Sequence, residues 1–408
     1  MKYVFLSLIF CLVACHAQNQ RPAIDRNYQF SNGVIPRNVL ESYLSRSITQ
    51  MDFLSFEGWG AYTDKDDDTR MLLNIGAKFI GRAICAWNNF EIFNRPDFWE
   101  KAKSKIDEMH TQDADMIFQS GIFEIISTQV SQVSVPAWVF EAFNLPVEHR
   151  NFVYEDMLNQ SGYGVNFWNK GASIPDISRQ ETRMLFYFMA CVYMETGIKA
   201  IHFGQVMLMA VDDQNNDFAA WSDLLGKVRK AAKKKARRGT ILCDAHLPGI
   251  VIDGHLLFDF VSYPMRPKEI LAEPQKAILE ESYLDAMYGR TKGGITPSGW
   301  SCDRSPYIVE FDNFGISDHP NVADPNHHTV WGYDEISWFA RQPEQYRNEY
   351  LEYAVNRIAG VDPARYLQMP GARCTVFLDR NGIYRANSSA TCTVGQNQEE
   401  TIKRIWSK

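Results

Sequence analysis

The sequence predicts an α/β chain folded as a (β/α)8 barrel with a short β-containing extension at its C-terminal end. Eight short apolar segments alternate with amphipathic helical segments, which is the order that a barrel of parallel strands requires. The 408 residues are enough for one large α/β domain. An open, doubly wound sheet is the alternative, but neither Gly-x-Gly-x-x-Gly nor a P-loop follows the first predicted strand.

The first half of the chain supplies four of the strands and their helices. A short helix with apolar residues at helical spacing is expected within residues 36–50, before the first strand. Gly76 and Gly197 stand where two of the later helices should end. We predict strands at 51–60, 78–87, 116–126 and 199–209, and helices at 66–75, 96–110, 178–196 and 217–238.

The second half supplies the other four strands. We predict strands at 240–246, 256–263, 306–315 and 365–369, and helices at 267–288 and 333–359. A break is expected near Pro343, because proline cannot continue a helix. The barrel should therefore cover residues 18–372, and residues 373–408 should add a β-hairpin and a last short helix.

The N-terminus predicts export. Residues 1–17 combine a basic start with an apolar run that is too short to span a bilayer, as in a signal peptide. Leu12-Val-Ala-Cys15 resembles a bacterial lipobox, which would place a lipid on Cys15; ordinary cleavage after Ala17 is the alternative. We expect a periplasmic protein or an outer-membrane or cell-surface lipoprotein that touches a membrane only through that anchor. In an oxidising compartment, Cys374 and Cys392 can form a disulfide or stay free.

The charge balance bears on partners. The formal net charge is −7 and the isoelectric point is near 5.8, so nucleic acid is not expected as a partner. The one basic run, Lys227 to Arg238, lies at the end of a predicted helix, where cations offset the negative end of the helix dipole. The sequence leaves the oligomeric state open.

Acidic residues cluster at the predicted strand ends, where barrel enzymes build their sites. Glu310 and Asp312 follow the seventh strand two residues apart, so they share one face. Glu57, Glu124 and Asp244 come from the ends of the first, third and fifth strands. We expect all five carboxyls to converge in one mouth as candidate catalytic groups.

Two long loops and several strand ends add candidate substrate-binding residues. Aromatic rings beside carboxylates fit stacking against sugars, although such rings also serve to hold loops in place. The candidates are Trp59, Trp138, Trp168, Gln205, His246, Trp300 and Trp331.

Glycoside hydrolysis is the chemistry that two strand-end carboxyls favour, because it needs one protonated and one ionised carboxyl and no metal or cofactor. Glu124 is the best candidate for the proton donor, since apolar neighbours and an aromatic-rich loop would exclude water from it. Metal-dependent chemistry through Asp244-x-His246 and Glu310-x-Asp312 is an alternative. A serine nucleophile has no Gly-x-Ser-x-Gly elbow.

In architecture the chain resembles the bacterial secreted or lipoprotein glycoside hydrolases with a (β/α)8 barrel. The resemblance implies that Glu310 is the nucleophile and that the substrate is an oligo- or polysaccharide. It departs at the fourth strand, where Gly204-Gln205 stands in place of an Asn-Glu acid/base. We therefore expect an exported carbohydrate-active hydrolase. The alternative is a glycan-binding surface protein of the same fold that is non-catalytic or uses a metal.

Overall fold

The computed structural model describes residues 26–30, 33–57, 65–262, 265–281, 290–313, 315–362, 364–377 and 381–408. The predicted signal segment 1–17 with Cys15, and the candidate Trp59, lie outside the described residues. Within the described ranges, no helix is both long and apolar enough to cross a membrane.

Two sheets occupy the centre of the molecule and, with the helices around them, confirm a mixed α/β fold. The larger sheet has the order β18-β17-β1-β2-β3-β6-β7, and the smaller has the order β10-β15-β16. All pairings in them are parallel except that of β17 with β18. These strands are β1 (Ser47–Gln50), β2 (Phe79–Ile84), β3 (Ile117–Gly121), β6 (Ala200–His202), β7 (Leu242–Asp244), β10 (Val261–Ser262), β15 (Tyr307–Val309), β16 (Arg365–Leu367), β17 (Met369–Val376) and β18 (Asn381–Arg385).

The smaller sheet continues the larger one at both ends. His246, two residues after β7, forms a parallel bridge with Ser262 of β10, and the Ser262 N–H donates to the Ala245 carbonyl at 3.0 Å. At the other end β16 leads through Gln368 into β17, which pairs with β1. Parallel pairs therefore follow chain order from β1 to β7 and from β10 to β16.

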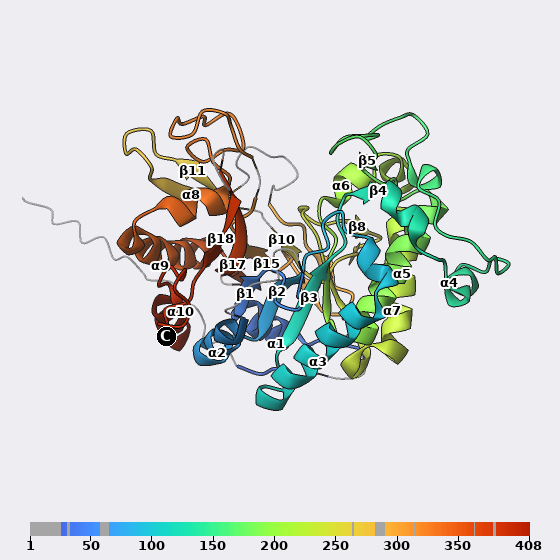
Figure 1. Ribbon diagram of the computed structural model, residues 1–408, viewed down its shortest axis with the longest axis horizontal. Helices are drawn as coiled ribbons and strands as arrows, with labels where there is room; N and C mark the ends of the chain where they lie inside the picture. The colour runs from blue at the N-terminus through green and yellow to red at the C-terminus, as the bar shows by residue number, and fades with distance from the viewer. Residues whose placement is uncertain are drawn as a thin grey trace, which may run out of the picture.

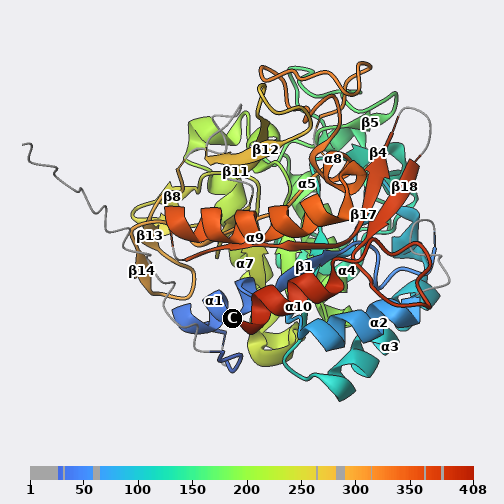
Figure 2. The same cartoon turned by 90° about the vertical axis from the view of Figure 1, so that its left-hand side faces the viewer.

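Helices surround the strands. In Figure 1, β1, β2 and β3 lie side by side at the centre, with α5 and α7 on one side and α9 and α10 on the other. Figure 2 shows α9, α10 and α2 across the second of these sides. The α-helices are α1 (Arg37–Leu44), α2 (Lys65–Ile75), α3 (Pro96–Gln112), α4 (Ala137–Ala142), α5 (Gln180–Thr196), α6 (Val206–Met209), α7 (Ala219–Lys235), α8 (Glu335–Arg341), α9 (Glu344–Val361) and α10 (Glu399–Ser407).

Short elements fill the connections. The 3-10 helices are η2 (Glu91–Asn94), η3 (Thr128–Gln132), η4 (Glu155–Met157), η5 (Asp213–Asn216) and η6 (Arg237–Gly239). The short strands are β4 (Ile126–Ser127), β5 (Ala172–Ser173), β8 (Val251–Ile252), β9 (His255–Leu256), β11 (Met265–Glu269), β12 (Ala277–Glu281), β13 (Gly294–Ile295) and β14 (Ser301–Cys302).

An apolar plug closes the N-terminal ends of the strands. One buried cluster joins Tyr28, Phe30 and α1 to residues at or near the start of β2, β3, β6 and β7, among them Phe79 and Leu242. Apolar area removed from water stabilises a fold by about 25 cal/mol per Å². The plug covers the N-terminal ends of these strands. Their C-terminal ends, where the polar residues stand, lie at the opposite rim.

Several predicted elements were wrong. The strand predicted at 199–209 is a strand only at Ala200–His202 and ends in α6, and the range 256–263 holds the end of one short strand, β9, and all of another, β10. The first strand is Ser47–Gln50, within the range predicted as helix, because β-branched Ile48 and Thr49 favour a strand and Asp52, with φ 55°, follows in a turn. The range predicted as a helix at 267–288 contains the antiparallel hairpin β11–β12, and residues 282–289 lie outside the described residues. Its prolines disfavour a helix, and Gln275, with φ 68°, makes the turn.

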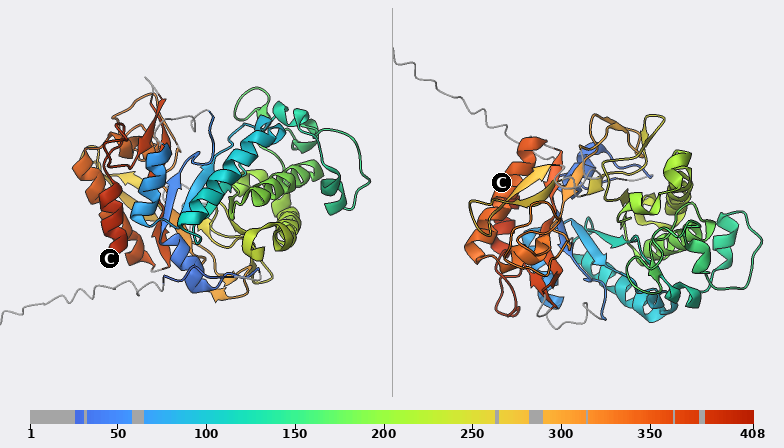
Figure 3. Two further views of the ribbon diagram at one scale, coloured as in Figure 1. Left: turned by 60° about the horizontal axis from the view of Figure 1, so that its bottom comes forward. Right: turned by 90° about the horizontal axis from the view of Figure 1, so that it is seen from above.

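The range predicted as a C-terminal extension, 373–408, contains the end of β17 and all of β18 and α10, which gather beside α9 (Figure 3), and β17 also pairs with β1 of the larger sheet. Arg385 of β18 contacts Asp68 of α2 at 3.3 Å, and Arg70 of α2 contacts Glu399 of α10 at 2.7 Å. The Cys374 thiol donates to Asn313 Oδ1 at 3.1 Å. In this structure Cys374 is not bonded to Cys392, and the disulfide that the sequence allows stays a prediction.

Candidate functional site

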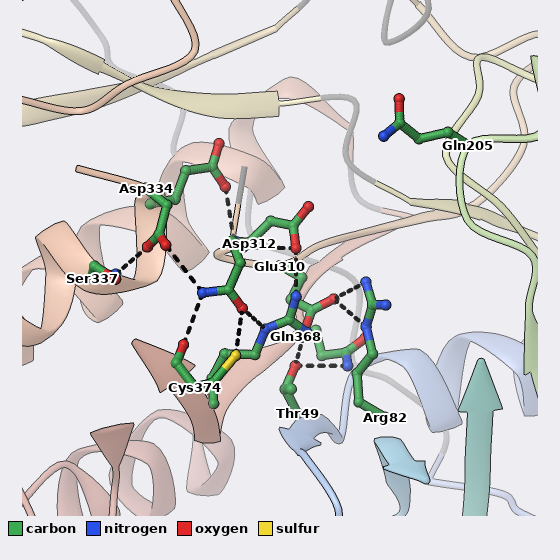
Figure 4. A network of polar contacts seen from close by, with 12 residues as sticks. Thr49, Arg82, Gln205, Glu310, Asp312, Asp334, Ser337, Gln368 and Cys374 are labelled. Carbon is green, nitrogen blue, oxygen red and sulfur yellow. Dashed lines mark hydrogen bonds and ion pairs between the residues drawn. The ribbon is translucent and has the colours of Figure 1, made fainter. Parts of the chain in front are cut away.

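Glu310 lies directly after β15, buried at the rim opposite the plug. Its Oε1 accepts from Thr49 Oγ1 of β1 at 2.7 Å and from Arg373 Nη1 at 2.7 Å, while its Oε2 accepts from Arg82 Nε at 3.3 Å and Nη2 at 3.2 Å. Two guanidinium groups next to one carboxyl favour its ionised form. Figure 4 shows Glu310, Asp312, Thr49 and Arg82 in one continuous polar network.

Asp312, the second acid of this strand end, is held by the same arginine. Arg373 Nη2 donates to Asp312 Oδ1 at 2.5 Å, and the Asp312 N–H donates to Glu335 Oε2 at 2.9 Å. Glu335 in turn accepts from Arg266 Nη1 at 2.6 Å. Asp312 is therefore part of a buried charge network that positions Arg373 beside Glu310.

Glu124 lies between β3 and β4 and is 4% exposed. Its Oε2 accepts the backbone N–H of Gln205 at 2.7 Å, and Gln205 Nε2 lies 3.4 Å from its Oε1. Burial raises the pKa of the Glu124 carboxyl, although the Gln205 N–H and the nearby charges of His202 and Arg82 oppose that rise. The raised pKa favours a protonated carboxyl, as predicted for a proton donor.

Gly204 makes the space in which the Glu124 carboxyl lies. A Cβ on Gly204 would come within 2.0 Å of Glu124 Oε2, and the backbone there has φ +55°. Glycine adopts this conformation without the penalty that a side chain would add. The side chain of Glu124 therefore occupies the position at the end of β6 that a side chain of residue 204 would otherwise fill.

Arg82 connects the surroundings of the two glutamates. It lies within β2 with φ 59°, binds Glu310, and places its guanidinium carbon 5.2 Å from the ring centroid of Phe123. Its positive charge also acts on the Glu124 carboxyl. Glu310 and Glu124 thus share one buried cation as a neighbour.

Asp244 is fully buried at the end of β7. It accepts from Gln119 Nε2 at 2.7 Å and from Ser262 Oγ at 2.5 Å, and its Oδ2 lies 2.7 Å from His202 Nδ1. The imidazole at hydrogen-bond distance from the Asp244 carboxyl is thus that of His202. Burial, followed by the charge of His202, lowers the pKa of His246 well below its usual value, so His246 is neutral at pH 7.

Glu57 is the exception among the five acids. Its side chain is 42% exposed and forms an ion pair with Arg95 at 2.7 Å. The first strand ends at Gln50, so Glu57 belongs to the following loop rather than to the strand end. We therefore remove Glu57 from the candidate catalytic set.

The predicted aromatic residues divide by position. Trp168 lies at the site, because its indole N–H donates to the Glu124 carbonyl at 2.8 Å. Trp138 instead packs its ring 5.9 Å from that of Tyr187 and 5.9 Å from that of Phe188 on α5. It therefore fixes α4, which projects at the edge of the molecule in Figure 1.

The two remaining tryptophans also hold segments in place. The Trp300 indole N–H donates to the Ile35 carbonyl at 3.1 Å, and its ring packs on the apolar plug at the opposite end of the strands. Trp331 is buried, and its backbone N–H donates to Glu269 of β11 at 2.8 Å. Neither contact places an indole beside Glu310 or Glu124. Gln205 lies apart from the Glu310 network in Figure 4 and contacts Glu124.

Sequence reasoning missed the cations of the site. Arg82 stands inside an apolar strand and Arg373 in the predicted extension. An arginine within an otherwise apolar strand was the available signal for Arg82, because an arginine is almost never fully buried unless it is paired. His202, beside Asp244, was missed as well. Among the described residues, no group of three or more His, Cys, Asp and Glu is arranged to hold a metal ion.

Comparison with known proteins gives structural neighbours only. No protein-family model matches the sequence, and no curated protein matches it. A native-form debranching enzyme from Nostoc punctiforme is similar to the chain, with a TM-score of 0.33 and 10% identity over 57% of this chain and 53% of that one. The chain thus matches about half the length of that enzyme. The GH113 β-mannanase AaManA from Alicyclobacillus acidocaldarius, in complex with ManMIm, gives a TM-score of 0.40 and 10% identity over 89% and 97% of the two chains.

Both neighbours are glycoside hydrolases, the class that the sequence resembles in architecture. At these TM-scores neither neighbour assigns a site residue or a substrate.

Proposed function

We propose that this chain is a glycoside hydrolase in which Glu124 is the general acid and Glu310 the ionised carboxylate. The fold we infer for it is a (β/α)8 barrel. The parallel pairings from β1 to β17, the bridge between His246 and Ser262, and the passage of β16 into β17 support this fold. The substrate we propose is an oligo- or polysaccharide.

One observation carries the proposal: two buried glutamates beside the same arginine have opposite electrostatic environments. Glu124 has its pKa raised by burial, whereas Glu310 faces the guanidinium groups of Arg82 and Arg373. Carboxyl pairs whose surroundings separate their protonation states are typical of acid and base assignments in enzymes. This division is what cleavage of a glycosidic bond requires.

The chemistry then follows from the two protonation states. Glu124 gives its proton to the leaving oxygen as the bond between that oxygen and the anomeric carbon breaks. Glu310 either attacks the anomeric carbon or takes a proton from the attacking water, and its distance to Glu124 decides between these routes. We expect the two carboxyls to lie about 5–10 Å apart, the range of retaining and inverting pairs.

The space beside Gly204 explains how the site can have a proton donor although the fourth barrel strand lacks the expected glutamate. The resemblance places an acid at the end of that strand, where this chain has Gly204-Gln205. Glu124 reaches the same place from the third barrel strand, against Gly204 and under the Gln205 N–H. We propose that the proton donor is supplied from the neighbouring strand in this way.

Glycan binding without turnover is the second candidate, and a specific observation favours it. From the described residues Glu310 accepts at least four hydrogen bonds, three of them from arginine. Such bonds stabilise the carboxylate and reduce its reactivity as a nucleophile. In a binding protein this network would be a fixed polar surface against which the sugar binds.

We propose that the protein is exported, on the strength of residues 1–17. Lipidation at Cys15 is the alternative to cleavage after Ala17, and mass spectrometry of the protein purified from membranes distinguishes them.

The test of the activity is sugar release from a panel of plant and microbial polysaccharides, with Glu124→Gln and the exposed control Glu100→Gln on α3 assayed beside the wild type. We expect release by wild type and control, and loss of at least about a hundredfold in Glu124→Gln. Glycan binding without release by the wild type would establish the second candidate instead. Unchanged turnover in Glu124→Gln would refute its role as the acid.

A further inference from the structure

Two large aromatic side chains beside the candidate site are exposed to solvent. Trp87 is 42% exposed and Phe167 is 57% exposed. Trp87 belongs to the loop after β2, and Phe167 to the long connection between β3 and α5. Exposed aromatic rings that lie together, unlike single ones, mark binding surfaces more often than packing.

Both rings rest on one half-buried tryptophan. The ring centroids of Trp87 and Trp168 are 5.1 Å apart at 79°, and those of Phe167 and Trp168 are 4.8 Å apart at 86°. Edge-to-face pairs of this kind stabilise by about 0.5–1.5 kcal/mol beyond their buried area. Trp168 therefore holds the two exposed rings in fixed orientations without covering them.

This aromatic surface, which we define as Trp87, Phe123, Phe167 and Trp168, is attached to the proposed acid. Phe123 precedes Glu124 in the chain, and its ring centroid lies 5.3 Å from that of Trp87. The Trp168 indole N–H donates to the Glu124 carbonyl at 2.8 Å. A ligand on the exposed rings would thus lie next to the residue that we assign as proton donor.

The surface itself carries no charge. Arg82 lies over Phe123, with its guanidinium carbon 5.2 Å from that ring centroid, and is ion-paired with Glu310 at 3.2 Å. The exposed rings therefore offer flat apolar faces rather than a place for an anion. The C–H face of a neutral pyranose ring is the part of an oligosaccharide that matches them.

We propose that Trp87 and Phe167 are the binding face for a neutral pyranose unit of the substrate, in the subsite next to Glu124. This inference rests on the proposed function and adds two residues that were not among the sequence candidates. Trp138 makes the contrast, because its ring is packed between α4 and α5.

The experiment is calorimetric titration of the full chain with cellohexaose, mannohexaose, xylohexaose and maltohexaose. The variants are Trp87→Ala and Phe167→Ala, and the matched control is Leu271→Ala, a residue 63% exposed near the β11–β12 turn. We expect at least one hexaose to bind the wild type and each aromatic variant to weaken its affinity about tenfold, equivalent to about 1.4 kcal/mol. The control should bind like the wild type, and urea unfolding of each variant shows that it is folded.

The outcomes separate the two proposals. Wild-type affinity in both aromatic variants, together with intact hydrolysis, refutes the binding face and leaves the proposed function standing. Weakened binding with no hydrolysis by the wild type supports the binding face and refutes the activity. A wild-type dimer that dissociates in both variants, with glycan affinity unchanged, means that a second copy covers the rings and also overturns the inference. Failure of the wild type to bind any hexaose refutes it as well.

Discussion

Replacing Glu310 with glutamine removes the negative charge between two buried arginines while keeping the side-chain shape. Arg82 and Arg373 are both largely buried and both donate to this carboxyl. Breaking a buried ion pair by removing one partner costs about 3–5 kcal/mol, because the other charge stays buried without compensation. Since Arg373 keeps its ion pair with Asp312, we expect the lower end, about 3 kcal/mol.

The assay is urea unfolding at pH 7 followed by tryptophan fluorescence, with Glu100→Gln as the exposed control. In a chain of 408 residues the expected loss lowers the Tm by about 3–4 °C. From the sequence alone, Glu310 is an acid at a strand end with no predicted ion pair. On that basis the Glu310→Gln substitution would leave the Tm nearly unchanged. A loss of unfolding free energy below about 1 kcal/mol would refute the ion-pair reasoning. In either case turnover should fall by several decades if Glu310 is the catalytic carboxylate.

Three further predictions concern the surroundings of Glu124 and the long loop. Gly204→Ala should reduce kcat about a hundredfold or more by displacing the Glu124 carboxyl. The control Gly226→Ala, in open space on α7, should leave kcat unchanged. Equal kcat values in the two variants would contradict the inference that Glu124 needs the space beside Gly204. The pKa of Glu124 is raised in the folded protein. The contribution of the protonated carboxyl to the unfolding free energy is therefore complete below the pKa of the unfolded state and is lost as pH rises through the pKa of the folded state. Glu124→Gln should therefore gain unfolding free energy relative to wild type as pH rises above 4.5, the ordinary pKa of a glutamate. A constant difference in urea titrations would argue against a raised pKa. Trp138→Ala should lower stability by about 1–2 kcal/mol without changing glycan affinity, and a change in affinity alone would return Trp138 to the site.

Much of the architecture was readable because it depends on local patterns. Gly197 ends α5 with φ 110°, and Pro343 separates α8 from α9, as predicted. Helices and strands were assigned wrongly where the residues that favour the correct element form only a short run. The apolar spacing of α1 extended the predicted helix over Ile48 and Thr49, and two prolines in the range 267–288 were outweighed by apolar residues at helical spacing.

The candidate site was only partly predictable, because its charges are paired across long stretches of chain. Glu124 and Glu310 were identifiable as strand-end acids, and both are buried at the strand ends. Their partners were not, since Arg82 lies 228 residues from Glu310 and Gln205 lies 81 residues from Glu124. The pairing depends on which strands become neighbours, and single-strand patterns do not contain that information. The prediction that Trp300 binds substrate was wrong for the same reason, because the loop of Trp300 folds back onto the apolar plug.

The central claim is that Glu124 gives a proton to the leaving group, and leaving-group dependence tests it most directly. The measurement compares Glu124→Gln with wild type on a natural oligosaccharide and on a dinitrophenyl glycoside of the same sugar, whose leaving group needs no protonation. We predict that the variant loses at least about a hundredfold in kcat/KM on the oligosaccharide and keeps most of the wild-type rate on the dinitrophenyl glycoside. Equal losses on both substrates would contradict the assignment of Glu124 as the acid.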